Sequence, residues 1–190
     1  TYDLDGDKML EFIALELNPD KDVFPKLVRY YEIDSDGYQT ILWEFIPPVA
    51  LEGEFVDAKI GDIDGNGAPE LVVVMNLTKF GDNSTPHVFI ATYDWDGTHF
   101  SEIPSTSLDI GKENRSLRCN NFELLDHDSD GEQEIVLSLG SPFRGFAIVN
   151  SSAEGLSITK KIRPDKLLVG SGLLYIASLD YDYDGYDDII

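Results

Sequence analysis

Four short acidic segments carry the side chains best suited to chemistry in this chain. Each begins with Asp and places an oxygen-bearing side chain at positions 1, 3, 5 and 9 counted from that Asp. These residues are Asp3, Asp5, Asp7 and Glu11 in the first acidic loop; Asp62, Asp64, Asn66 and Glu70 in the second; Asp126, Asp128, Asp130 and Glu134 in the third; Asp180, Asp182, Asp184 and Asp188 in the fourth. A Gly falls at position 4 or 6 of every copy, and an apolar run follows. The copies begin at 3, 62, 126 and 180, so they form an internal repeat with a period of 50 to 65 residues.

This spacing suits a hard divalent cation. Ca²⁺ takes roughly 6–8 oxygens from carboxylates, amides, backbone carbonyls and water. Side chains at alternate positions of a tight loop converge, and Gly lets the backbone curl around the point where they meet. The carbonyls at position 7 would add one oxygen each, from Met9, Ala68, Glu132 and Tyr186. We therefore predict up to four Ca²⁺ sites, one per loop; the alternative is a set of solvated Asp-Gly turns.

The residues around the loops predict strands rather than helices. An EF-hand has a Glu at position 12 and flanking helices, whereas Ala14, Val73 and Leu137 stand at that position here. Segments rich in Val, Ile, Leu and aromatic residues, which favour strands, lie at 11–17, 26–37, 38–45, 54–62, 70–77, 87–97, 98–103, 118–126, 134–140, 145–155, 156–162 and 173–180. The pairs Asp36-Gly37, Asp96-Gly97 and Glu154-Gly155 mark hairpin turns between them.

About four strands per unit is typical of β-propeller blades. We therefore expect an all-β fold in which blades of four antiparallel strands form a partial propeller. The single domain at 1–190 would contain blades at 1–46, 53–104 and 117–163 and an incomplete one at 172–190. A closed propeller needs roughly 4–8 blades, so we expect a piece of a longer protein whose two ends fall within blades. An open arc, or a ring completed by the N-terminal strands, is the alternative.

The loops and their strand context resemble the FG-GAP/VCBS repeats of integrin-alpha-like calcium-binding propellers. The resemblance implies one Ca²⁺ per loop, held by the side chains at positions 1, 3, 5 and 9. The Phe-Gly that precedes the loop in that family is absent here, although Gly61 stands where a Gly is usual. Only 140–142, Gly-Ser-Pro, resembles the Gly-Ala-Pro that follows the strand after the loop. These departures favour the looser VCBS type of repeat.

The composition limits the partners and the compartment. The chain has 36 Asp and Glu against 14 Lys and Arg, a formal net charge of −22, which argues against nucleic-acid binding. No apolar run approaches the roughly 20 residues of a membrane span. Extracellular calcium modules bind at roughly 10⁻⁴–10⁻³ M, so we expect an extracellular, cell-surface or periplasmic protein. The single cysteine, Cys119, lies in a strand segment and is expected in the core.

No arrangement of residues predicts catalysis. His87, His99 and His127 lack a nearby nucleophile or acid in a recognisable catalytic spacing. We expect His127, at loop position 2, to point away from a bound metal and to be exposed. The aromatic residues of the hairpin strands are expected to pack between blades, and Tyr38 and Trp95, near turns, are candidates for an exposed contact.

Two classes of function follow from these expectations. The first is a non-enzymatic binding or adhesion scaffold for a protein or a polysaccharide. The second is an accessory propeller of a secreted carbohydrate-active or other hydrolytic enzyme whose catalytic residues lie outside this chain.

Overall fold

A computed structural model describes residues 3–17, 26–46, 51–80, 87–103, 106–108, 117–140, 143–163, 175–183 and 188–189. Its regular elements are fourteen strands, with no helix in these ranges. The strands are β1 (Leu10–Leu17), β2 (Lys26–Ile33), β3 (Gln39–Phe45), β4 (Leu51–Gly61), β5 (Glu70–Phe80), β6 (His87–Trp95), β7 (Phe100–Glu102), β8 (Thr106–Leu108), β9 (Cys119–Leu125), β10 (Glu134–Leu139), β11 (Gly145–Asn150), β12 (Ser157–Ile162), β13 (Ser178–Leu179) and β14 (Asp188–Ile189). None of the described segments is a helix that could cross a membrane.

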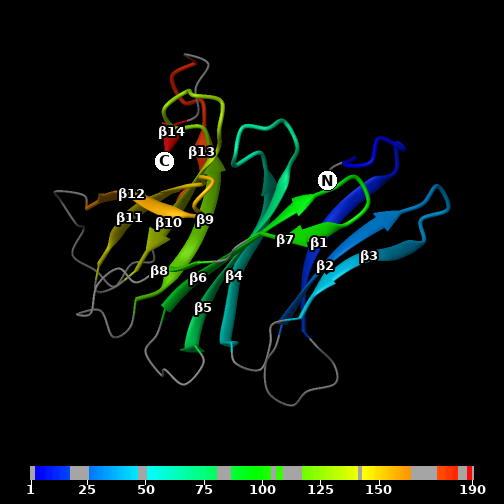
Figure 1. Ribbon diagram of the computed structural model, residues 1–190, viewed down its shortest axis with the longest axis horizontal. Helices are drawn as coiled ribbons and strands as arrows, with labels where there is room; N and C mark the ends of the chain where they lie inside the picture. The colour runs from blue at the N-terminus through cyan, green and yellow to red at the C-terminus, as the bar shows by residue number, and fades with distance from the viewer. Residues whose placement is uncertain are drawn as a thin grey trace.

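The strands form sheets that follow the order of the chain (Figure 1). The first sheet is β1-β2-β3, the second β4-β5-β6-β7, the third β9-β10-β11-β12, and β13 pairs with β14. Every pairing is antiparallel. The all-β class and the antiparallel strands are therefore confirmed. Strand β8, which pairs with β6, was not predicted from the sequence.

The apolar strands lie where two neighbouring sheets cover both of their faces. All six residues of β10 are buried, whereas most of β12 is exposed. A strand covered on both faces has a continuous apolar run rather than an alternation of apolar and polar residues, as in 71–74 of β5. One buried cluster joins the second and third sheets, and another joins the first and second. The runs after the second and third acidic loops are thus the centre of the core.

Aromatic side chains fill the contact between the first and second sheets, as predicted. Tyr30 and Trp43 of the first sheet meet Tyr93, Trp95 and Phe100 of the second, with ring centroids 5.0–5.6 Å apart. The prediction of an exposed Trp95 is wrong. Its ring packs in this cluster and its Nε1 donates a hydrogen bond to a backbone carbonyl of the first acidic loop, at 3.2 Å.

Asparagine side chains connect neighbouring sheets through paired hydrogen bonds. Asn76 on β5 accepts from the N–H of Cys119 and donates to its carbonyl, both at 2.8 Å. Asn121 on β9 does the same with Ile176, at 3.1 and 2.7 Å. Cys119 itself is 3% exposed, which confirms its predicted place in the core. The first three acidic loops emerge at the same end of their sheets, at the top of Figure 1.

Candidate functional site

The four acidic loops share one hydrogen bond that joins the end of the loop to its start. In each loop the carboxylate at position 9 accepts from the backbone N–H of position 2. The pairs are Glu11 with Leu4 at 2.8 Å, Glu70 with Ile63 at 2.8 Å, Glu134 with His127 at 2.9 Å, and Asp188 with Tyr181 at 3.1 Å. The repeat seen in the sequence is therefore also a repeat of backbone geometry.

Further side-chain bonds to the backbone shape the first three loops. The side chain at position 5 accepts from the N–H of position 7, and in the second and third loops position 1 accepts from the Gly at position 6. The bonds are Asp7 to Met9 at 2.7 Å, Asn66 to Ala68 at 2.6 Å, Asp130 to Glu132 at 2.9 Å, Asp62 to Gly67 at 2.9 Å and Asp126 to Gly131 at 3.0 Å. Gly67 and Gly131 have φ of 83° and 96°, a conformation that favours glycine. That the carbonyls at position 7 are ligands stays a prediction.

The first loop brings all four of its predicted acids together. Asp3, Asp5, Asp7 and Glu11 each place a carboxylate oxygen within 4.8 Å of the others. Glu11 is fully buried, and its Oε1 has no hydrogen-bond partner. Burial, and then the charges of Asp5 and Asp3, raise the pKa of the Glu11 carboxyl above its usual value, against the opposite effect of the N–H of Leu4 and the hydroxyl of Tyr30. A buried carboxylate oxygen without a partner is unfavourable, so this all-oxygen group fits a hard cation such as Ca²⁺.

The second loop has the same character. Asp62, Asp64 and Glu70 share a group of oxygens within 4.8 Å, and Oδ1 of Asp62 is buried without a hydrogen-bond partner. Glu70 is 1% exposed, and burial, followed by repulsion from Asp64, Asp62 and Asp94, raises the pKa of its carboxyl to about 7. Asn66 donates from Nδ2 to Asp64 at 3.0 Å. This loop also fits an oxygen-binding cation.

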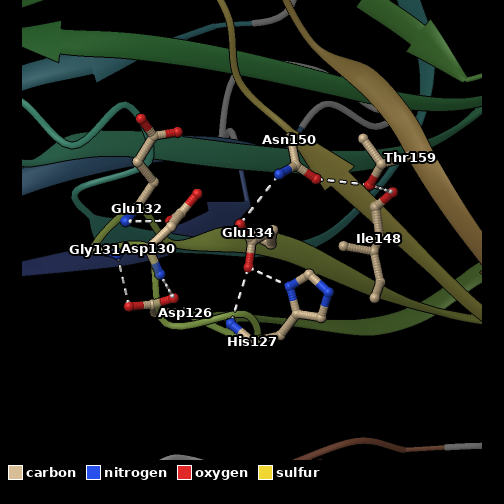
Figure 2. A network of polar contacts seen from close by, with 9 residues as sticks. All are labelled: Asp126, His127, Asp130, Gly131, Glu132, Glu134, Ile148, Asn150 and Thr159. Carbon is tan, nitrogen blue, oxygen red and sulfur yellow. Dashed lines mark hydrogen bonds and ion pairs between the residues drawn. The ribbon is translucent and has the colours of Figure 1, made fainter.

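The third loop divides its predicted ligands into two groups. Asp126, Asp128 and Asp130 lie together, whereas Glu134 lies with His127 and Asp128. Figure 2 shows the His127 ring directed at Glu134, with Nδ1 2.6 Å from Oε2. The prediction of an exposed His127 is wrong: its side chain is 25% exposed and contacts a carboxylate that is 1% exposed. A buried carboxylate requires donors, and here the ring is one of them.

The fourth loop is described only in part. Asp180 and Asp182 lie in the described part of this loop, and Asp188, at position 9, accepts the closing hydrogen bond. The predicted ligands Asp184 and Tyr186 lie outside the described residues.

The second and third loops lie side by side. The Glu132 side chain passes over Gly65. A Cβ added to Gly65 would lie 2.7 Å from Cγ of Glu132. The N–H of the next residue, Gln133, donates to the carbonyl of Asp62 at 2.9 Å. Burial, and then the charges of Asp130 and Asp64, raise the pKa of the Glu132 carboxyl. The sequence assigned Glu132 only a backbone role, because no local pattern indicates a contact between sheets.

A second set of side chains near the loops was also missed. Glu32 and Asp94 stand directly opposite Glu11 and Glu70 on the neighbouring strands. Residues opposite each other in an antiparallel pair share a face of the sheet, so each adds negative charge beside its loop.

Comparison with known proteins gives one similarity. The chain is 31% identical over 106 residues to "Rhamnogalacturonan endolyase YesW" of Bacillus subtilis (strain 168), a match covering 52% of this chain and 16% of that relative. No family model matches the chain, and no solved structure matches it significantly. The similarity thus concerns a small part of a much longer polysaccharide-cleaving enzyme.

Proposed function

We propose that this chain is a calcium-binding repeat region in which each acidic loop holds one Ca²⁺ at the edge of its sheet. The observation that carries the proposal is the unpartnered, fully buried Oε1 of Glu11, which lies with three aspartate carboxylates. A bound Ca²⁺ would supply this oxygen with a partner and offset the repulsion between the acids. The ion would have a structural role, because it would join the start of a loop to the strand that follows.

The proposed ligands in the first loop are the side chains of Asp3, Asp5, Asp7 and Glu11, with the carbonyl of Met9. The second and third loops would use the corresponding residues. The ligands of the fourth loop are proposed from its sequence alone. Binding at about ten times the dissociation constant stabilises a folded state by about 1.4 kcal/mol per site. Several sites together would therefore contribute a large part of a typical domain stability of about 5–15 kcal/mol.

The experiment that tests this proposal is a thermal melt with millimolar Ca²⁺, with EGTA, and with Mg²⁺ as the control for ionic strength. We expect a rise in the melting temperature that is specific to Ca²⁺ and that shrinks in Glu11→Gln. The matched control is Glu154→Gln, at an exposed turn residue. Equal melting temperatures in Ca²⁺ and EGTA would refute the proposal.

We further propose that the region belongs to a protein that acts on a polysaccharide. The similarity to a rhamnogalacturonan endolyase supports this class, and it favours an accessory region of a carbohydrate-active enzyme over a protein-binding adhesion scaffold. The sheets would then be blades of a VCBS-type propeller, and the catalytic residues would lie elsewhere in the protein. The protein would be located outside the cytoplasm, in a compartment where Ca²⁺ is abundant.

Affinity electrophoresis tests this second part. The protein is run through gels containing rhamnogalacturonan or an uncharged glucan, each with Ca²⁺ and with EGTA. Retardation by rhamnogalacturonan in Ca²⁺ is the expected result. Equal mobility in all gels would leave the adhesion scaffold as the better proposal.

A further inference from the structure

The closing glutamate of the third loop is held differently from those of the first two. Oε2 of Glu134 accepts from the backbone N–H and from Nδ1 of His127, at 2.9 and 2.6 Å, and Oε1 accepts from Nδ2 of Asn150 at 3.2 Å (Figure 2). Both oxygens therefore have protein donors. In the first loop, by contrast, Oε1 of Glu11 has none.

Two substitutions within the repeat produce this difference. Position 2 is Leu4 in the first loop and Ile63 in the second, and neither side chain has a donor, whereas the third loop has His127. The residue on the strand opposite the closing glutamate also changes. An acid stands opposite Glu11 and Glu70, but the register of β10 and β11, continued by one residue, places Asn150 opposite Glu134.

Asn150 is itself oriented by the third sheet. Its Oδ1 accepts from Oγ1 of Thr159 on β12 at 2.7 Å, so its Nδ2 is directed at Glu134. The ring of His127 donates from Nδ1 in the Nδ1–H tautomer of the neutral ring as well as in the charged form, so this contact does not require a charged ring. In the first two loops an acid stands opposite the closing glutamate, whereas in the third loop Asn150 and the His127 ring both donate to it, although Asp128 also lies beside it.

We infer that His127 and Asn150 take the place of a cation at Glu134, so that the third loop closes without Ca²⁺ and binds Ca²⁺ more weakly than the first two loops. The inference rests on the proposed calcium function. Calcium could use Glu134 only by breaking its contacts with His127 and Asn150. Because hydrogen bonds to a charged group are worth roughly 1.5–3 kcal/mol, we expect the third loop to bind at least about tenfold more weakly.

The test is a calorimetric titration of the whole chain with Ca²⁺ alone. We expect Ca²⁺ to bind in tight steps, assigned to the first two loops, and in a weaker step, assigned to the third. Asp64→Ala should remove a tight binding step, whereas Asp128→Ala should remove the weaker one. In His127→Leu, which copies the residue at position 2 of the first loop, the step assigned to the third loop should become about tenfold tighter. Asn150→Asp, which copies the acid opposite Glu70, should have the same effect. It replaces His127→Leu as the test if circular dichroism shows that His127→Leu does not fold.

A matched control and a spectroscopic measurement separate this role from a general effect on folding. His99→Leu removes another histidine that contacts an acid, with Nδ1 2.9 Å from Asp96 in an exposed turn, and it should leave every step unchanged. Long-range ¹H–¹⁵N spectra of the His127 ring should change only during the weaker step. A merely structural histidine would give ring signals that do not follow that step.

The outcomes distinguish the inference from the function on which it rests. An absence of Ca²⁺ binding in every loop would overturn the calcium proposal. Tight binding at the first two loops with an equally tight third step, unchanged in His127→Leu and Asn150→Asp, would overturn only the inference. Zn²⁺ bound by the ring of His127 more tightly than Ca²⁺ at this loop would also overturn it, because His127 would then be a ligand.

Discussion

Replacement of Glu70 by Gln should stabilise the metal-free protein and should reduce the stability that the protein gains from Ca²⁺. Glu70 is 1% exposed, and burial together with the nearby acids raises the pKa of its carboxyl from 4.5 to about 7. Each pKa unit corresponds to 1.36 kcal/mol, so the ionised carboxylate destabilises the metal-free fold by about 3 kcal/mol. This is a large fraction of a typical domain stability of roughly 5–15 kcal/mol.

The sign follows from proton binding. Between pH 4.5 and 7 the folded state keeps the proton of Glu70 while the unfolded state has released it, so the contribution of Glu70 to stability falls as the pH rises through this range. At pH 8 the full cost is present. Glu70→Gln removes the charge but keeps an oxygen that can accept from the N–H of Ile63. We therefore expect the variant to be more stable than the wild type by up to about 3 kcal/mol in metal-free buffer at pH 8, and nearly equal to it at pH 4.5.

Calcium should reduce this difference. An ionised Glu70 is the form that binds Ca²⁺, so the wild type should gain more stability from millimolar Ca²⁺ than the variant does. The assay is urea unfolding followed by tryptophan fluorescence, at both pH values and with and without Ca²⁺. Glu154→Gln, at an exposed turn, is the control and should match the wild type throughout. A Gln variant that is less stable in metal-free buffer at pH 8, or that gains as much from Ca²⁺ as the wild type, would refute the reasoning.

Three further predictions concern contacts between and within sheets. Asn76→Ala should lower the free energy of unfolding by about 2–3 kcal/mol, because it leaves the N–H and the carbonyl of Cys119 without their partners; a loss below about 0.5 kcal/mol in urea unfolding would contradict this role. Glu132→Gln, which keeps the backbone of the third loop, should weaken Ca²⁺ binding to the second loop severalfold in calorimetry, since it removes a charge lying over that loop, and an unchanged affinity would count against the contact. Gly145→Ala should lower the melting temperature in Ca²⁺ and EGTA alike, because its Cβ would meet the carbonyl oxygen of Ile162; a loss seen in EGTA alone would contradict a packing effect.

The acidic loops could be located from the sequence, because the bonds that shape them are local. The closing contact joins residues seven positions apart, as in Leu4 and Glu11, and the inner bonds join residues two to five positions apart. Such contacts follow from the order of Asp and Gly along the chain. The strands were predictable for a similar reason, since the buried runs such as 71–74 are continuous in the sequence.

Contacts that cross between strands or sheets were decided by the tertiary structure. The acids opposite Glu11 and Glu70, and the amide opposite Glu134, depend on the register of each hairpin. The position of Glu132 over the second loop and the burial of Trp95 depend on how two sheets pack. The sequence by itself therefore determined the spacing of the proposed cation ligands, because that spacing is local to each loop. Only the tertiary structure decided how each site differs, because the charges and donors around a loop come from strands that are distant in the chain.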